Sequence, residues 1–245
     1  DWWKNNVRKD NDFWEYEVPD KLDEIIDDDF PKWDVLIIDE GQDFKSFWFD
    51  ILFKLVHSDS KIYIFKDDMQ NIFNFYTDVP SNLKFGQYDL IENCRNCMTI
   101  IKYLKELTGK EIKTFENPPL GSEVVEKSFK NGIELTKELI SAITNLVQNH
   151  GVGPEQILII LNSKKSESSL SETKKIGKFP LKALDNKARF ERNKINYTSI
   201  RTFKGMEADV VFVIDTHLIK DEQRVNLLYT EASRAKHKLS LYSRN

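Results

Sequence analysis

The sequence predicts an α/β fold in which parallel strands are flanked by helices. Two short apolar runs, Val35–Ile38 and Lys61–Phe65, each end close to a pair of acids. Such runs are typical of parallel strands that are buried on both faces. Gly132–Asn149 carries apolar residues at helical spacing and predicts an amphipathic helix. Strands that alternate with helices indicate a doubly wound sheet, whose ligands lie at the carboxyl ends of the strands.

The first third of the chain predicts two helices beside these strands. Asp20–Phe30 has its apolar residues on one side and is stopped by Pro31. Phe47–Val56 predicts a helix that follows the first strand. The stretch Asp78–Leu90 contains Pro, Ser, Gly and Asn, which favours a domain boundary. We therefore expect one domain in residues 1–88 and a second in residues 89–245.

The second part of the chain continues the alternation. It predicts helices at Asn93–Thr108 and Gln223–Ala235, and strands at Glu123–Phe129, Gln156–Leu161, Tyr197–Ile200, Asp209–Ile214 and Leu239–Tyr242. Lys164–Lys194 is polar, Ser-rich and basic. We favour a solvated helix and loop for this segment, and a phosphate-contacting surface is the alternative.

Composition sets the limits of the interpretation. The 245 residues are 40% hydrophobic, which is enough for one large domain or two modest ones. No apolar run approaches the ~20 residues of a membrane span, and no signal peptide begins the chain, so we expect a cytoplasmic protein without a membrane partner. The net charge of −4 excludes a chromatin-type basic protein, but a local groove can still bind nucleic acid. Because the chain starts at Asp1 and not at Met, we expect a piece of a longer protein.

The two cysteines, Cys94 and Cys97, form a lone Cys-x-x-Cys. A zinc site would need two more ligands, and no His is close in sequence. We favour two thiols on one helical face, with a redox pair as the alternative.

Asp39 and Glu40 come directly after the first predicted strand. Nucleotide hydrolysis needs a carboxylate that holds Mg²⁺ and a group that orients the attacking water, and two adjacent acids can supply both. Acids also end strands simply to meet solvent, and for a bare Asp-Glu pair the two interpretations are equally strong. Gln42 and Asp43 extend the pair to Asp-Glu-x-Gln-Asp.

Four further motifs follow in order: Asp67-Asp68-Met69-Gln70, Asn93-Cys94-Arg95-Asn96, Phe203-Lys204-Gly205-Met206-Glu207 and Tyr229-Thr230-Glu231-Ala232-Ser233-Arg234-Ala235. Together with Asp39–Asp43 they resemble the later motifs of a superfamily-one DNA helicase of the UvrD/Rep type. The resemblance implies two RecA-like P-loop NTPase domains, each with a parallel sheet flanked by helices, and ATP between them. Residues 1–88 would be the C-terminal part of the first domain, and residues 89–245 the complete second domain.

The resemblance also implies roles for the motif residues of the first domain. Asp39 would hold Mg²⁺, Glu40 would be the catalytic base, and Gln70 would sense the terminal phosphate of ATP and couple hydrolysis to movement. Phe75 would stack on a DNA base, a contact worth ~1–3 kcal/mol; an ordinary core residue is an equally strong interpretation. Lys66 replaces the usual glycine of this motif.

In the second domain, the resemblance assigns Arg95 to the γ-phosphate, a task that suits its fixed fork of donors. The backbone at Gly205 would approach the phosphates, Glu207 would bond the ribose, and Arg234 would be an arginine finger. The residues before this glycine, Arg201 and Thr202, are candidates for contact with the DNA backbone. Cys94 replaces the usual tyrosine, which makes this the weakest of the five motif matches.

The function implied is an ATP-dependent DNA helicase or translocase that moves 3′ to 5′ along single-stranded DNA or along DNA with a single-stranded tail. The sequence contains no Gly-Lys-Ser/Thr phosphate-binding loop, so we expect these residues alone not to hydrolyse ATP. One alternative is a helicase-derived nucleic-acid-binding or regulatory module without ATPase activity. Another class of nucleotide-binding ATPase would share only the Asp-Glu pair. The oligomeric state is not predicted.

Overall fold

The computed structural model describes residues 10–27, 29–72, 85–184 and 190–245. The chain divides into two compact units, Asp1–Tyr88 and Asp89–Asn245. This division falls inside the Asp78–Leu90 stretch whose composition favours a boundary. That the first unit is the end of a RecA-like domain stays a prediction.

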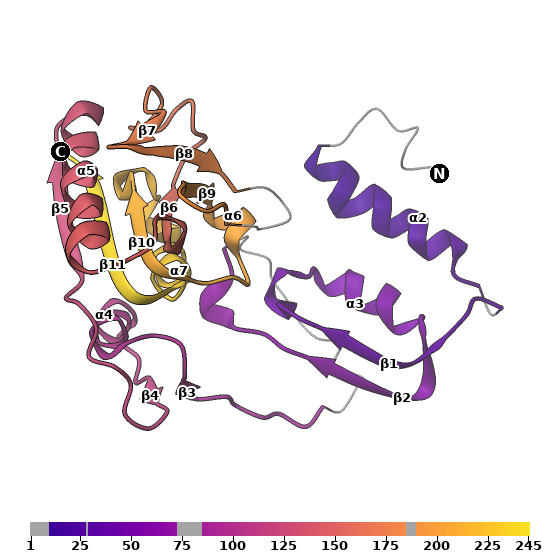
Figure 1. Ribbon diagram of the computed structural model, residues 1–245. Helices are drawn as coiled ribbons and strands as arrows, with labels where there is room; N and C mark the ends of the chain where they lie inside the picture. The colour runs from indigo at the N-terminus through magenta and orange to yellow at the C-terminus, as the bar shows by residue number, and fades with distance from the viewer. Residues whose placement is uncertain (1–9, 28, 73–84, 185–189) are drawn as a thin grey trace. The chain divides into compact units, whose positions relative to one another are not determined.

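The first unit is built around two parallel strands (Figure 1). Its elements in chain order are η1 (Phe13–Glu17), α2 (Val18–Ile25), β1 (Trp33–Ile38), η2 (Gly41–Asp43), α3 (Ser46–Phe53), β2 (Val56–Ile64) and η3 (Asp68–Gln70). The helix α3 makes the crossover between β1 and β2, as parallel strands require. Its Phe49 is fully buried and forms part of the small core of this unit, together with Phe13.

The prediction that β1 is buried on both faces is wrong. Ile38 is buried, but Ile37 is 64% exposed. Ile37 pairs in register with Tyr63 of β2, which is 49% exposed, so the two side chains lie on one open face of the sheet. In the described ranges the sheet of this unit has only these two strands, and a sheet this small has a covered face and an open one.

The second unit contains a seven-stranded sheet with the order β5-β11-β10-β6-β9-β8-β7. The strands are β5 (Val125–Phe129), β6 (Ile157–Leu161), β7 (Lys175–Ile176), β8 (Phe179–Ala183), β9 (Ile195–Ser199), β10 (Ala208–Ile214) and β11 (Ala235–Arg244). All neighbours are parallel except β7 and β8. The predicted α/β fold, with a mostly parallel sheet flanked by helices, is confirmed.

Helices lie on both faces of this sheet (Figure 1). The helix α5 (Gly132–Asn149) packs its buried residues, such as Leu139, against Ile159 and Phe212 of the central strands. The opposite side carries α4 (Met98–Thr108), which packs against α7 (Asp221–Ala232) and β11. The remaining short elements are β3 (Glu92–Asn93), β4 (Lys113–Thr114), η4 (Pro154–Gln156), α6 (Ile200–Phe203) and η5 (Thr216–Leu218).

Two segments of the second unit differ from their predictions. In Lys164–Lys194, expected to be a helix and loop, β7 and β8 form a hairpin that extends the sheet. The hairpin forms because Ile176 is buried against α5 and Gly177 makes the turn at φ 58°. The helix expected from Asn93 begins only at Met98, because β3 and a turn come first.

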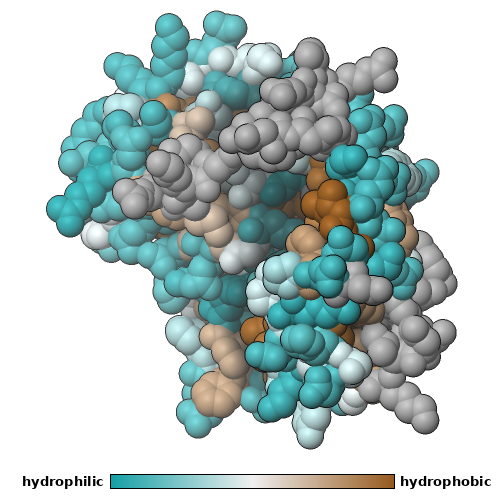
Figure 2. All heavy atoms as spheres, turned by 90° about the vertical axis from the view of Figure 1, so that its right-hand side faces the viewer, coloured by the Kyte–Doolittle hydropathy of each residue, from teal (hydrophilic) through white to brown (hydrophobic). Residues whose placement is uncertain are grey.

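Over the described ranges, none of the helices has the length and apolar character that a membrane span requires. The face drawn in Figure 2 is mostly hydrophilic, with hydrophobic residues gathered in small patches.

Candidate functional site

The chain makes a tight turn directly after β1, where the predicted metal ligand, Asp39, and the predicted base, Glu40, lie. Glu40 has a left-handed backbone, with φ 53° and ψ 44°, a conformation that is uncommon for a residue with a side chain. The amide of Gly41 then donates to the carbonyl of Phe65 over 2.7 Å. A Cβ atom at Gly41 would lie 2.7 Å from Cγ2 of Ile64. The backbone at Gly41 therefore lies so close to the end of β2 that a side chain would clash there, which explains the glycine at this position of the motif.

Gln42 connects the two predicted motifs of the first unit. Its side chain is buried, its Nε2 donates to Glu40 Oε2 over 2.5 Å, and its Oε1 accepts from the amide of Asp67 over 2.9 Å. Asp67 in turn accepts from Gln70 Nε2 at Oδ2 over 2.8 Å. A continuous hydrogen-bond chain thus runs from the predicted base, Glu40, to the predicted coupling residue, Gln70.

Asp39 is exposed at the end of β1, and its Oδ1 accepts from the amide of Glu40 over 2.9 Å. Its second oxygen has the chemistry that Mg²⁺ prefers. Among the described residues, no group of three or more His, Cys, Asp or Glu side chains is arranged to hold a metal. This does not conflict with a magnesium ion held by one carboxylate, water and phosphate oxygens, which is the usual arrangement in nucleotide enzymes.

Three charged side chains from distant parts of the sequence meet in the second unit. Arg95, in the turn before α4, donates from Nε to Oε2 of Glu207 over 2.8 Å. Lys236, at the start of β11, makes an ion pair with Oε1 of the same carboxylate. We name Arg95, Glu207 and Lys236 the Glu207 cluster. Its members are each about one-third exposed, with values of 38%, 39% and 35%, so the cluster borders solvent.

The electrostatics of this cluster are those of a carboxylate between two cations. The hydrogen bond from Lys236 and that from Arg95 lower the pKa of Glu207, and its partial burial acts in the opposite direction. Glu207 is therefore ionised at neutral pH.

Arg234 lies at the end of α7 and is 1% exposed. Its Nε donates to the carbonyl of Thr230 over 3.2 Å, and its Nη1 to that of Met206 over 3.3 Å. The guanidinium thus holds the end of α7 against the segment that precedes Glu207. The role of an arginine finger stays a prediction.

Asn96 joins the Arg95 turn to the Arg234 segment. Its Nδ2 donates to the carbonyls of Ser233 over 3.0 Å and Ala235 over 2.6 Å. Together with Lys236, it is a site residue that the sequence analysis missed. Asn96 belongs to the Asn-Cys-Arg-Asn motif, but nothing in a single sequence shows that its amide reaches a segment so far along the chain.

The remaining predicted residues have the following positions. Arg201 and Thr202 are exposed on α6. Gly205 is exposed and has φ 81°, a conformation that favours glycine. Phe75 lies outside the described residues.

Part of this arrangement matches a known family. Residues 195–242 match the UvrD-like helicase C-terminal domain. The matched segment contains Gly205, Glu207 and Arg234, so the predicted resemblance to UvrD-type helicases is confirmed there. The second unit therefore carries a helicase-like segment.

One solved structure is also similar to the chain. It is the C-terminal domain of a possible DNA helicase from Lactobacillus plantarum WCFS1, with 19% sequence identity and a TM-score of 0.49. The similarity covers 61% of this chain and 86% of that one. A comparison with curated proteins finds no relative.

Proposed function

We propose that this chain is the C-terminal portion of an ATP-dependent DNA helicase or translocase, which couples ATP hydrolysis to movement along single-stranded DNA. The observation that carries the proposal is the Glu207 cluster. Arg95 and Glu207 are predicted separately to contact nucleotide, and they form a hydrogen bond although 112 positions separate them in sequence. Residues with one shared ligand are expected to be neighbours in the fold.

In the first unit, Glu40 takes the role of the base that accepts a proton from the attacking water. Its hydrogen bond from Gln42 fixes the carboxylate, and the chain of bonds through Asp67 to Gln70 links the base to the residue that senses the terminal phosphate. Asp39 would hold Mg²⁺, which neutralises phosphate charge when it is bound.

In the second unit, Glu207 receives the ribose hydroxyl, and Arg95 neutralises charge on the terminal phosphate. Arg234 supplies a second guanidinium. Because its donors now bond the carbonyls of Thr230 and Met206, this role requires at least one of them to turn toward the nucleotide.

Contacts with nucleic acid are assigned to the remaining predicted residues. Arg201 and Thr202 are exposed on α6, inside the matched segment, and would contact phosphates of the DNA strand. Phe75 would stack on a base. Movement in the 3′ to 5′ direction is part of the same proposal and follows from the resemblance.

A second candidate function is a nucleic-acid-binding module without ATPase activity. The burial of Arg234 favours it, because this guanidinium already has a structural role in the second unit. The intact set of Asp39, Glu40 and Gln70 favours the enzyme.

Binding of a fluorescein-labelled dT20 oligonucleotide to the chain, followed by fluorescence anisotropy at several salt concentrations, tests the shared part of both functions. We expect salt-dependent binding and an affinity about five- to tenfold weaker in the Arg201→Ala variant. Lys110→Ala, a change on an exposed residue outside the matched segment, is the control. Absence of binding by the unmodified chain would contradict both functions. DNA-stimulated ATP hydrolysis, measured on the full-length protein because these residues alone are not expected to hydrolyse ATP, then separates the two functions.

A further inference from the structure

A cavity of about 300 Å³ lies between α5 and the strands β5, β10 and β11 of the second unit. None of the residues that line it belongs to the predicted nucleotide or DNA contacts. The cavity is therefore separate from the residues on which the proposed helicase function rests.

The strand register determines which side chains face the cavity. Val210 of β10 pairs with Lys238 of β11, and Ser240 of β11 pairs with Val125 of β5, so these four residues lie on one face of the sheet. Val210 also belongs to the core beneath α5, which identifies this face as the one that α5 covers.

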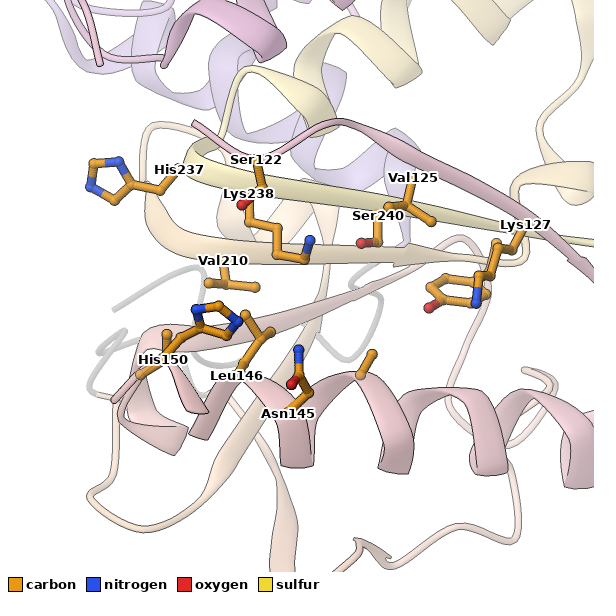
Figure 3. A pocket seen from close by; sticks show the side chains of 13 residues that line it. Ser122, Val125, Lys127, Asn145, Leu146, His150, Val210, His237, Lys238 and Ser240 are labelled. Carbon is orange, nitrogen blue, oxygen red and sulfur yellow. The ribbon is translucent and has the colours of Figure 1, made fainter. Parts of the chain in front are cut away.

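The last turns of α5 form the opposite wall. Ala142, Asn145, Leu146 and His150 line the cavity from the helix side. In Figure 3, Lys238 runs from its strand into the space above the helix, and Asn145 and His150 rise toward it. His237 points away from this space in the same view.

The charge in the cavity is one-sided. Lysines and histidines line it, and among the described residues no acid does. Lys127 is neutralised, because its Nζ bonds Glu138 over 2.6 Å. The side chain of Lys238 makes no hydrogen bond or ion pair with any residue in the described ranges. Partial burial lowers the pKa of Lys238, as is expected for an ammonium without a nearby counter-charge.

The walls around this ammonium are apolar. Ala142, Leu146, Val152 and Val210 form a hydrophobic surface next to Lys238. An apolar surface with one uncompensated cation is complementary to a ligand that has a hydrocarbon or aromatic body and one anionic group. The amide of Asn145 and the hydroxyl of Ser240 add hydrogen-bonding groups for that anion.

We propose that this cavity is a binding site for a small amphipathic anion, a carboxylate or phosphate monoester whose charged group pairs with Lys238 and whose apolar body packs on Leu146 and Val210. The site belongs to the second unit alone. The proposal does not depend on ATP hydrolysis or on DNA binding.

A competing account gives Lys238 a purely structural role at the carboxyl end of α5, where cations are favoured. The carbonyl of Leu146 at this end already accepts from the amides of His150 and Val152. This account predicts that no anion binds, so binding measurements distinguish the two.

The test is isothermal titration of the chain with four probes: phenyl phosphate, benzoate, inorganic phosphate and neutral benzyl alcohol. We expect saturable binding of phenyl phosphate or benzoate, and at least tenfold weaker binding of the other two. Stronger binding of phenyl phosphate than of benzoate would assign a phosphate monoester, and the reverse a carboxylate. Absence of binding by both aromatic anions overturns the proposal, as does equal binding of benzyl alcohol.

Variants locate the site. Lys238→Met keeps the apolar stem and removes the charge, and we expect it to weaken anion binding about tenfold or more. Lys127→Met is the matched control, because this lysine lines the same cavity but is already paired with Glu138. Ala142→Leu keeps Lys238 and fills the space, so it should also abolish binding. Equal affinity of the Lys238→Met and Lys127→Met variants, or full binding by Ala142→Leu, contradicts the proposal, and circular dichroism verifies that each variant is folded.

Discussion

Gln42 donates a hydrogen bond to Glu40 over 2.5 Å, while the other end of its side chain accepts from the backbone of Asp67. Removal of this buried side chain would leave the Glu40 carboxylate without a donor and the Asp67 amide without an acceptor. Such a loss costs about 1–3 kcal/mol of stability. The two hydrogen bonds of Gln42 should therefore stabilise the first unit whether or not a ligand is bound.

Replacement of Gln42 by Ala should lower the stability of the first unit by about 1–3 kcal/mol. The amide of Asp67 should also exchange with solvent faster, since it loses its acceptor. Hydrogen exchange followed by NMR measures this amide directly. Lys61→Ala, a change at an exposed position of β2, is the control and should stay within about 0.5 kcal/mol. Unchanged exchange at Asp67 would show that the bond from Gln42 contributes nothing.

Gly41→Ala should destabilise the first unit by about 1–3 kcal/mol, because the new methyl group would meet Cγ2 of Ile64 at 2.7 Å. Gly86→Ala is the matched control, since a Cβ atom there would have no neighbour within 4 Å. Urea denaturation compares the two variants. Equal stability would mean that the turn after β1 can move without cost.

Glu207 should titrate below the ordinary glutamate pKa of 4.5, because Lys236 and Arg95 bond its ionised form. A depressed folded-state pKa gives stability that is present above pH 4.5 and is lost as pH falls through the folded pKa. Carbon-13 NMR of the side-chain carboxyl follows this titration. In the Lys236→Met variant the titration midpoint of Glu207 should rise toward the ordinary glutamate value. In the Lys236→Arg variant the midpoint should stay low, because the positive charge is kept. A midpoint that ignores both changes would contradict the ion pair.

Glu231 should make stability fall as pH rises. Its carboxyl is fully buried, and burial raises its pKa to about 8, an effect that Asn162 partly opposes. Since the unfolded group loses its proton near pH 4.5, the folded protein binds more protons between these two values. Stability should therefore decrease through this window, with a slope of at most about 1.4 kcal/mol per pH unit.

The variant Glu231→Gln isolates this effect, because it keeps the shape of the side chain and cannot ionise. Urea denaturation from pH 5 to 8 should show a flatter profile for the variant than for the unmodified chain. Parallel profiles would mean that Glu231 finds a charge partner when it ionises.

The sequence predicted correctly those elements whose bounds depend on neighbouring residues alone, such as helix caps and apolar spacing. The helix α5 has the predicted bounds because Asn131 caps it, accepting from the amides of Ile133 and Glu134, while its apolar residues keep helical spacing. The hairpin of β7 and β8 escaped prediction because a surplus of lysines hid the alternation of Phe179 and Leu181. Charge on the solvent-facing side of β8, the strand next to the sheet edge, does not prevent its other side from packing.

At the site, too, local motifs were predictable from the sequence, whereas contacts between distant segments were not. The motif order identified Arg95 and Glu207 as candidates, and the structure brings them together. Lys236 could not be found in this way, because one lysine next to a histidine and another lysine resembles an exposed strand start. The open face of β1 was missed because an apolar run shows that a strand can be buried, but not how many neighbouring elements are present to cover it.

The central claim is that Glu40 is the base of an ATP-driven helicase. The most direct test measures DNA-stimulated ATP hydrolysis by the full-length protein and by its Glu40→Gln variant. We predict that single-stranded DNA stimulates hydrolysis and that Glu40→Gln lowers the turnover number by about 10²–10⁴, the usual contribution of a general base, while DNA binding is retained. Turnover that is absent in the unmodified protein, or unchanged in the variant, would contradict the assignment of this chain to an ATP-driven helicase.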